Sequence, residues 1–265
     1  MTAQKATFIH PSAVVEEGAE IGAGCLIGPF AVIGPEVVLG TGVEVKSHAV
    51  ITGWTEIGAE SVIFPFACVG ETPQDMKYRG ERTRLIVGAC TRIREGATLN
   101  TGTAGGGGIT RVGDDCLFMT GAHVGHDVQV GNRVILANQV ALGGHCLLGD
   151  DVIIGGLSGV HQHVRIGAGA IIGAVTMVTK DVIPHGLVQA PRGRLEGLNL
   201  VGLKRRGATR ADISALRAAY GVLASGEGPF MDRARRLAAE TDNALVSDVA
   251  AFILSDSARS FLTPQ

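Results

Sequence analysis

The sequence predicts a parallel β-helix of hexapeptide repeats, followed by a small C-terminal α-helical domain. Three observations predict this fold. Aliphatic residues recur at every sixth position, most of them are followed directly by glycine, and the spacing becomes helical near the C-terminus. A period of six is neither the 3.6 of a helix nor the alternation of an ordinary strand.

The repeat runs in two series, which are in different phases. The first series, interrupted after Val69, comprises Ile9, Val15, Ile21, Ile27, Ile33, Leu39, Val45, Ile51, Ile57, Ile63, Val69, Val87, Ile93 and Leu99. The second comprises Val112, Phe118, Val124, Val130, Leu136, Leu142, Leu148, Ile154, Val160, Ile166, Ile172 and Val178. We therefore expect stacked coils over residues 1–190, with loops leaving them near 70–86 and 103–111.

Each hexapeptide is interpreted as a short strand plus a bend, with its first residue pointing inward. The glycine after this residue is expected to supply the backbone angles of a tight corner. The fifth residue is usually small and is interpreted as a second inward position, as in Cys25, Ala31, Ala49, Cys116, Val128 and Cys146. Most of the cysteines would then be part of the core.

Residues 191–265 are predicted to form the helical domain. Segments such as RADISALRAAYGVL and DNALVSDVAAFIL carry apolar residues at helical spacing. Lys and Arg outnumber Asp and Glu by 11 to 8 from Arg192 onward, although the whole chain has a formal charge of −2. The domain is therefore mildly basic.

Composition excludes several classes of protein. The overall charge gives no basic field for nucleic acid, and no apolar run is long enough for a membrane span. The N-terminal segment lacks the apolar region of a signal peptide. The five cysteines form no CxxC pair, which predicts neither disulfides nor a zinc framework and favours the cytoplasm.

Histidines concentrate in the second series, at positions 123, 126, 145, 161 and 163. If a coil has 18 residues, His126 stacks with Gly144 and Gln162. His126 is the third residue of its hexapeptide, so its side chain is expected to project outward. Histidines, an adjacent carboxylate and glycine N–H groups on one face predict a functional cluster.

This cluster suits acyl transfer. His126 could take the proton from an attacking hydroxyl as a general base. Asp127 is the candidate to orient it, although adjacent strand residues often point apart. The N–H of Gly144 could stabilise an oxyanion. No serine or cysteine pairs with these histidines, which favours direct transfer over a covalent enzyme intermediate.

Several segments carry a specific resemblance to a known family. HPSAVVEEGAEIG, GETPQDMKYRGERT, GAHVGHD, GNRVILAN, VHQHVRIG and NLVGLKRRG resemble the acyl-[acyl-carrier-protein]–UDP-N-acetylglucosamine O-acyltransferases of lipid A biosynthesis. The resemblance implies a left-handed β-helix with three hexapeptides per coil and a homotrimer with sites between subunits. It also implies transfer of an (R)-3-hydroxyacyl chain from acyl carrier protein to the 3-hydroxyl of UDP-N-acetylglucosamine, without metal or cofactor.

The resemblance also implies residue roles. His126 would be the general base, and the Gly144 N–H would hold the oxyanion. Contacts with the sugar or the hydroxyacyl group are implied for Gln74, Asp75 and Lys77 on the first loop, and the cleft between subunits would be lined by His123, His145, His161 and Gln162. Contacts with the nucleotide phosphates or the carrier are implied for Asn199, Arg205 and Arg206, with Lys204 nearby. Ile171 and Ala174 would lie at the end of the acyl groove, where alanine in place of glycine shortens the space.

Two departures from the family pattern leave alternatives open. Asn100-Thr101-Gly102-Thr103 stands where relatives often have HRGT, and Val201 stands where an acidic residue is common. The acceptor could accordingly carry a 3-amino group in place of the 3-hydroxyl. More remote alternatives are a zinc site on the histidines and a non-enzymatic β-helix that only binds.

Overall fold

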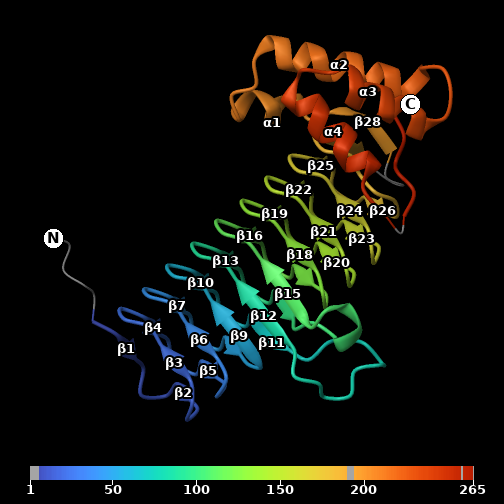
Figure 1. Cartoon of the computed structure of the whole chain (residues 1–265). Coiled ribbons are helices and arrows are strands. Elements are labelled where there is room, and N and C mark those ends of the chain that lie inside the picture. Colours follow the sequence, from blue (N-terminus) through green and yellow to red (C-terminus); the bar gives the residue numbers. More distant parts are fainter. Residues whose placement is uncertain (1–5, 190–193, 258, 265) are drawn as a thin grey trace.

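The computed structural model describes residues 6–189, 194–257 and 259–264. Short strands stack into three long parallel sheets that form the sides of an elongated prism, and helices cover one end of it (Figure 1). The predicted parallel β-helix is therefore confirmed. The predicted domain boundary between residues 190 and 191 lies outside the described residues.

The coil passes through the three sheets in turn. The first sheet contains, in spatial order, β1 (Phe8–Ile9), β4 (Leu26–Ile27), β7 (Glu44–Val45), β10 (Val62–Ile63), β13 (Arg92–Ile93), β16 (Leu117–Phe118), β19 (Ile135–Leu136), β22 (Ile153–Ile154), β25 (Ile171–Ile172), β27 (Gly186–Gln189) and β28 (Arg194–Leu198). The second contains β2 (Val14–Val15), β5 (Val32–Ile33), β8 (Val50–Ile51), β11 (Cys68–Glu71), β14 (Thr98–Asn100), β17 (His123–Val124), β20 (Ala141–Leu142), β23 (Gly159–Val160) and β26 (Met177–Val178). The third contains β3 (Glu20–Ile21), β6 (Val38–Leu39), β9 (Trp54–Ile57), β12 (Arg84–Val87), β15 (Ile109–Val112), β18 (Gln129–Val130), β21 (Leu147–Leu148) and β24 (Arg165–Ile166).

Neighbouring coils are in register. Val32 pairs with Val50, and His123 pairs with Ala141. A regular coil therefore has 18 residues, so positions 18 apart in the sequence lie directly above one another. Two longer connections interrupt this register, between β11 and β12 and between β14 and β15. The second of them contains the short 3-10 helix η1 (Ala104–Gly106).

The prediction that glycine after each inward aliphatic provides the corner angles was wrong. The left-handed backbone conformation occurs two residues after the position where glycine is common, at residues such as Phe30, His48 and Asp127. A Cβ at Gly22 would instead lie 2.6 Å from the backbone of Gly40 in the next coil. Glycine follows the inward residue because the neighbouring coil approaches too closely for a side chain.

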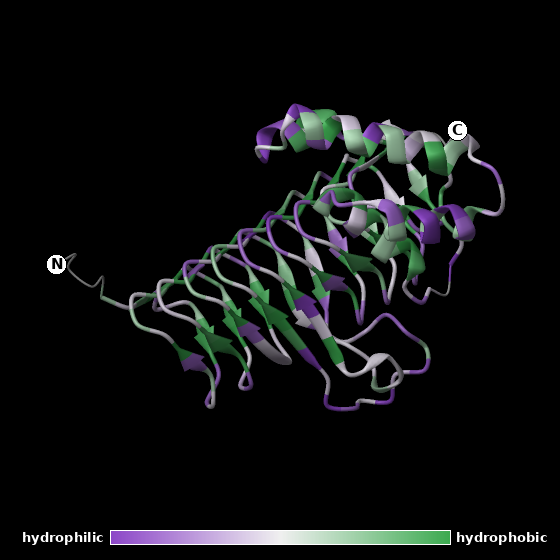
Figure 2. Cartoon of the chain, turned by 45° about the horizontal axis from the view of Figure 1, so that its top comes forward, coloured by the Kyte–Doolittle hydropathy of each residue, from purple (hydrophilic) through white to green (hydrophobic). Residues whose placement is uncertain are grey.

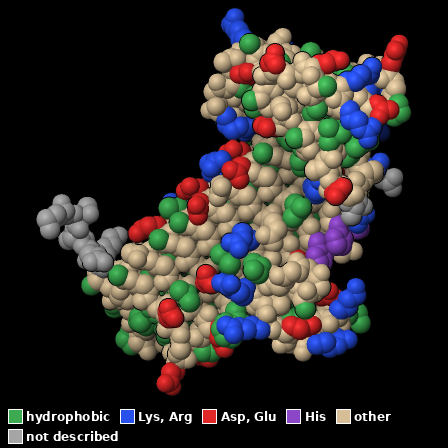
Figure 3. Space-filling view, viewed as in Figure 1, with side chains coloured by type: hydrophobic (Ala, Val, Ile, Leu, Met, Phe, Trp, Pro, Cys, Tyr) green, Lys and Arg blue, Asp and Glu red, His purple; other side chains and the backbone are tan. Residues whose placement is uncertain are grey.

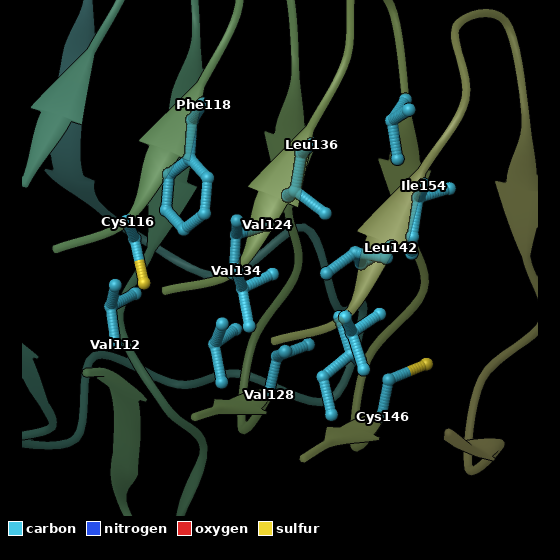
Figure 4. Close-up of a cluster of buried hydrophobic side chains, with 14 of the residues drawn as sticks. Val112, Cys116, Phe118, Val124, Val128, Val134, Leu136, Leu142, Cys146 and Ile154 are labelled. Atoms are coloured by element: carbon cyan, nitrogen blue, oxygen red, sulfur yellow. The ribbon is translucent and has the colours of Figure 1, made fainter. Parts of the chain in front are cut away.

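The core fills the prism as the hexapeptide pattern predicts. Figure 4 shows the inward residues Phe118, Val124, Leu136, Leu142 and Ile154, with the fifth-position residues Cys116, Val128, Val134 and Cys146 beside them; all of these are buried. Cys25 is buried as well, whereas Cys68 is half-buried and Cys90 is exposed. The strands are largely hydrophobic, whereas much of the connection from β11 to β12 is hydrophilic (Figure 2).

The helical part begins beyond an antiparallel pair. β27 pairs with β25 in the last coil and with β28 on its other side. The helices described beyond β28 are α1 (Leu200–Arg205), α2 (Arg210–Ser225), α3 (Phe230–Glu240) and α4 (Ala244–Leu254). A capping box of Thr209 and Asp212 starts α2, and Asn243 caps α4. Among the described residues, no helix is both long and apolar enough to cross a membrane.

Candidate active site

Coil stacking gathers the histidines on one edge of the prism. The N–H of His145 donates to the carbonyl of His126 over 2.9 Å, and this hydrogen bond joins two neighbouring coils. The rings of His126 and His145 meet edge-on with centroids 4.9 Å apart, and His145 stacks on His163 at 4.5 Å. A patch of histidine side chains is visible between the projecting loop region and the helical part (Figure 3).

His126 and Asp127 point to the same place although they are adjacent in sequence. Asp127 has a φ of 60°, in the left-handed region, so the chain turns at this residue and the usual alternation of a strand is broken. The Nδ1 atom of His126 lies 2.8 Å from Oδ2 of Asp127. The side chain of Asp127 is 1% exposed, so this contact is shielded from water.

The second long connection holds the Asp127 carboxylate from the other side. The N–H of Thr103 donates to Oδ1 over 2.8 Å, and the Thr103 hydroxyl donates to Oδ2 over 2.6 Å. A carboxylate that receives three bonds acts as an acceptor only, so His126 donates through Nδ1–H and keeps the lone pair of Nε2 free. His126 is thus arranged as a base.

Sequence reasoning missed Thr103. The available signal was the glycine-rich stretch AGGGG that follows it. A Cβ on Gly106 would lie 2.1 Å from Cγ of Asp127. The loop can close over the carboxylate only because no side chain stands at that position.

A groove of about 540 Å³ runs past His126 along the second sheet. Residues implied by the family resemblance that line it are Gln74, His123, His126, Gly144, His161 and Gln162, and Asn100 and Met177 lie beside them. A Cβ on Gly144 would lie 2.6 Å from the His126 ring, so the two are in contact. Within the described parts of the chain, no group accepts a hydrogen bond from the Gly144 N–H.

Burial shifts the pKa values of two histidines beside His126. Burial lowers the pKa of His123, and nearby His126 lowers it further. Burial also lowers the pKa of His145, against the opposing effect of Asp127. The backbone N–H of Lys77 is the main cause of a lowered pKa at Asp75, with His126 contributing, so the first loop brings a carboxylate close to the histidines.

Asn100 leaves an unpaired acceptor beside the groove. Its Nδ2 group donates to the carbonyls of Glu71 and Thr72, at 3.3 and 2.9 Å, which orients the amide. Its Oδ1 atom is buried and has no partner among the described residues. A ligand donor reaching this position would therefore find a free oxygen.

The candidate residues at α1 and its two ends, Asn199, Arg205 and Arg206, lie outside this groove. Asn199 caps α1, accepting from the N–H of Gly202 and donating to the carbonyl of Gly169. Arg206 donates to Nδ1 of His185 over 3.2 Å, while Lys204 and Arg205 are exposed. Ile171 and Ala174, on the coil that follows β24, do not line the groove of their own chain either.

His126, Asp127 and His145 could together hold a metal ion. Their ligand atoms all lie within 4.8 Å of one another. However, Nδ1 of His126 and both carboxylate oxygens of Asp127 already take part in the hydrogen bonds to each other and to Thr103. A metal at these atoms would have to displace those bonds.

Comparison with known proteins gives consistent matches. A family model for bacterial transferase hexapeptide repeats matches residues 4–35, 18–53 and 109–144, and one described as UDP N-acetylglucosamine O-acyltransferase, domain 2, matches 181–262. A relative from Paracoccus denitrificans, named acyl-[acyl-carrier-protein]–UDP-N-acetylglucosamine O-acyltransferase, is 65% identical over 196 residues, or 74% of each chain. A relative of the same name from Rhizobium johnstonii is 47% identical and covers 97% of this chain and 94% of its own.

Solved structures agree with these relatives. A UDP-N-acetylglucosamine acyltransferase crystal structure superimposes with a TM-score of 0.94 at 38% identity, covering 97% of this chain and 99% of the other. The Campylobacter jejuni enzyme of that name gives 0.92 at 36% identity, covering 97% and 100%. Together with the stacked parallel sheets, these matches confirm the fold class of a left-handed parallel β-helix with a small C-terminal helical domain.

Proposed function

The chain belongs to the family of acyl-[acyl-carrier-protein]–UDP-N-acetylglucosamine O-acyltransferases, and from this premise we propose that His126 is its general base. The protein is an enzyme that transfers an acyl chain from acyl carrier protein to UDP-N-acetylglucosamine. One observation carries the mechanism: Asp127 accepts a hydrogen bond from Nδ1–H of His126, which leaves the lone pair of Nε2 free in the groove, beside Gly144.

The proposed reaction is a direct transfer. Nε2 of His126 removes the proton from the 3-hydroxyl of the sugar while that oxygen attacks the thioester carbonyl of an (R)-3-hydroxyacyl chain. The Gly144 N–H stabilises the oxyanion of the tetrahedral intermediate. When the intermediate collapses, the carbon–sulfur bond breaks and the protonated His126 returns its proton to the departing thiolate.

Asp127 stabilises the positively charged imidazolium during these steps, as the third member of a triad does. No enzyme nucleophile is required. Burial raises the pKa of the Cys116 thiol to about 11 and that of the Cys146 thiol to about 12, so both remain protonated near neutral pH. Their reactivity as nucleophiles is correspondingly low.

Substrate contacts are proposed on both sides of His126. Gln74, Asp75 and Lys77 on the first loop would contact the sugar or the hydroxyacyl group. His123, His161 and Gln162, which line the groove, would contact the substrates directly. His145 does not line the groove but packs edge-on against His126, and it would contact the substrates from there. Asn100 would offer its free oxygen to a donor of the bound substrates.

We propose that three chains assemble with a site in each cleft between subunits. The family resemblance implies site roles for Arg205, Arg206, Ile171 and Ala174. They lie outside the groove of their own chain, so they would act in the groove of a neighbour. Asn199 would contribute by holding the first turn of α1. Light scattering should give three times the chain mass of 27.3 kDa, and a monomer in solution would contradict this assembly.

The alternative acceptor with a 3-amino group is not favoured, because the relatives reported above are named O-acyltransferases. A β-helix that only binds is likewise not favoured. We place the reaction in the cytoplasm as a proposal, supported by the free thiols of all five cysteines.

Replacing His126 by alanine tests the proposal. Because the general base is lost, kcat for ester formation on UDP-N-acetylglucosamine should fall roughly 10²–10⁴-fold while the circular dichroism spectrum is unchanged. His10→Ala is the matched control, since His10 lies in the first coil and its side chain hydrogen-bonds to Ser12. Activity of His126→Ala within a few-fold of the wild type would exclude His126 as the base.

A further inference from the structure

The segment after α4 returns from the helices to the coils that carry the active site. We refer to its described residues, 255–257 and 259–264, as the C-terminal strap. The N–H of Asp181 donates to the carbonyl of Ser260 over 2.9 Å, and the N–H of Leu262 donates to the carbonyl of Asp181 over 2.7 Å. The strap is therefore paired with the end of the β-helix.

A buried ion pair fixes the strap further. Nε of Arg165 lies 2.6 Å from Oδ2 of Asp181, and both side chains are removed from solvent. Nη1 of Arg165 donates to Oγ of Ser255 and to the carbonyl of Asp256, at 2.8 and 2.7 Å. The strap is thus held at several points on either side of Arg259.

This placement brings Arg259 to the rim of the histidine groove. Its Nη2 atom lies 2.8 Å from Nδ1 of His161 and 3.0 Å from the carbonyl oxygen of Gln162. His161 and Gln162 both line the groove beside His126. A residue almost a hundred positions later in the chain therefore contacts the active site.

The contact determines the tautomer of His161. A guanidinium is always a donor and cannot accept a hydrogen bond, so Nδ1 of His161 must be the unprotonated acceptor. Nδ1 is also 3.2 Å from the carbonyl oxygen of Gln162. One Nη2 group with two hydrogens satisfies both acceptors, whereas a proton on Nδ1 would face the guanidinium donor at 2.8 Å.

We infer that Arg259 is a positioning residue of the active site, which holds His161 as the neutral Nε2–H tautomer. His161 then presents a hydrogen-bond donor to an oxygen atom of the bound substrates. With Nδ1 occupied and Nε2 protonated, His161 also cannot act as a second base in competition with His126. This inference rests on the proposed role of His161 as a substrate-contacting residue.

The tautomer can be observed directly by ¹⁵N NMR of the imidazole nitrogens in the full-length enzyme. The signals of His161 are those absent from the spectrum of His161→Ala. In the wild type at neutral pH we expect Nδ1 at the shift of an unprotonated nitrogen and Nε2 at that of a protonated one. In Arg259→Met, the Nδ1–H form, bonded to the Gln162 carbonyl, should appear.

Kinetics test whether the contact acts through His161. Arg259→Met should lower kcat/KM about tenfold, the effect of one charged hydrogen bond, and Arg259→Lys, which keeps a donor, should recover part of it. In a His161→Ala background, Arg259→Met should change kcat/KM less than twofold. Arg235→Met is the control, because Arg235 is exposed on α3 and pairs with Asp232 on the same helix.

Each outcome decides one question. A protonated Nδ1 in the wild type overturns the inference whatever the stability of the variants. An equal loss from Arg259→Met in both backgrounds overturns it too, because Arg259 then acts independently of His161. Full activity of His161→Ala would instead contradict the proposed substrate contact of His161 and leave the tautomer result standing.

Discussion

Asp127 combines two properties that a single residue seldom has. Its left-handed backbone turns the chain at the corner of the coil, and its side chain orients the base that precedes it. The position of His126 could be predicted, since the third residue of a hexapeptide faces outward. The direction of Asp127 could not, because it depends on a backbone angle and on Thr103 in a loop that follows no repeat.

Gly144 is the residue whose substitution most directly disturbs the base without removing it. In Gly144→Ala the new Cβ would be 2.6 Å from the His126 ring, so the ring must move. A displacement of this size should lower kcat roughly 10–100-fold. The fold should be retained, because the clash is with a side chain.

Steady-state kinetics of Gly144→Ala, measured in parallel with the control variant Gly197→Ala, check this prediction. Apart from the chain neighbours of Gly197, no described residue has an atom within 4 Å of the position that a Cβ at Gly197 would take, so this control should retain normal kcat. If Gly144→Ala turned over at the wild-type rate, the contact between Gly144 and His126 would have no catalytic importance.

At the scale of elements, the hexapeptides were predictable and the connections were not. Inward aliphatics such as Leu136 and Leu142 are buried at the expected period, because a parallel coil repeats one environment every six residues. The loop bearing Thr103 and the strap bearing Arg259 have no period. Their contacts with Asp127 and His161 arise only from the folded chain.

The strap should depend on Asp181, the buried carboxylate to which it is anchored. Asp181→Ala leaves Arg165 buried without its counter-charge, and this should lower the free energy of unfolding by about 3–5 kcal/mol. Urea denaturation followed by circular dichroism measures the change. Asp242→Ala, at an exposed position, should stay within about 0.5 kcal/mol of the wild type; an equal effect of both variants would contradict the anchoring role.

At the scale of the whole molecule, the coils and the first long connection line the groove, the second connection holds Asp127, and the strap contacts the rim. The helical part is joined to the last coil through His185, whose carbonyl accepts from the N–H of Asn199 and whose ring accepts from Arg206. The family and the general reaction could be predicted from the sequence motifs. The assembly around the groove could not, because it depends on surfaces brought together by the coil register.

His185 should make the stability of the folded protein depend on pH. Burial, and secondarily Arg206, lowers the pKa of His185 to about 4 from its usual value near 6.5. Between these values the unfolded chain binds a proton that the folded chain does not, so stability falls as the pH falls through this window. The loss attributable to this group is about 3 kcal/mol by pH 4.

Denaturation curves at a series of pH values measure this dependence. His185→Asn keeps a residue that tolerates the left-handed φ of 60° but removes the titrating ring. The slope of stability between pH 6.5 and 4 should be smaller in this variant than in the wild type. An unchanged slope would show that other groups cause the acid sensitivity.

The central claim is that Asp127 accepts a hydrogen bond from Nδ1–H of His126 and so keeps Nε2 unprotonated as the base. Measuring kcat of Asp127→Asn tests this claim most directly. The N–H of Thr103 should keep the amide oxygen on its side, so the amide NH₂ faces Nδ1 of His126 and forces the proton onto Nε2. The account predicts that kcat falls roughly 10²–10⁴-fold while the circular dichroism spectrum and the unfolding midpoint stay close to those of the wild type. A folded Asp127→Asn variant with near-normal kcat would contradict it.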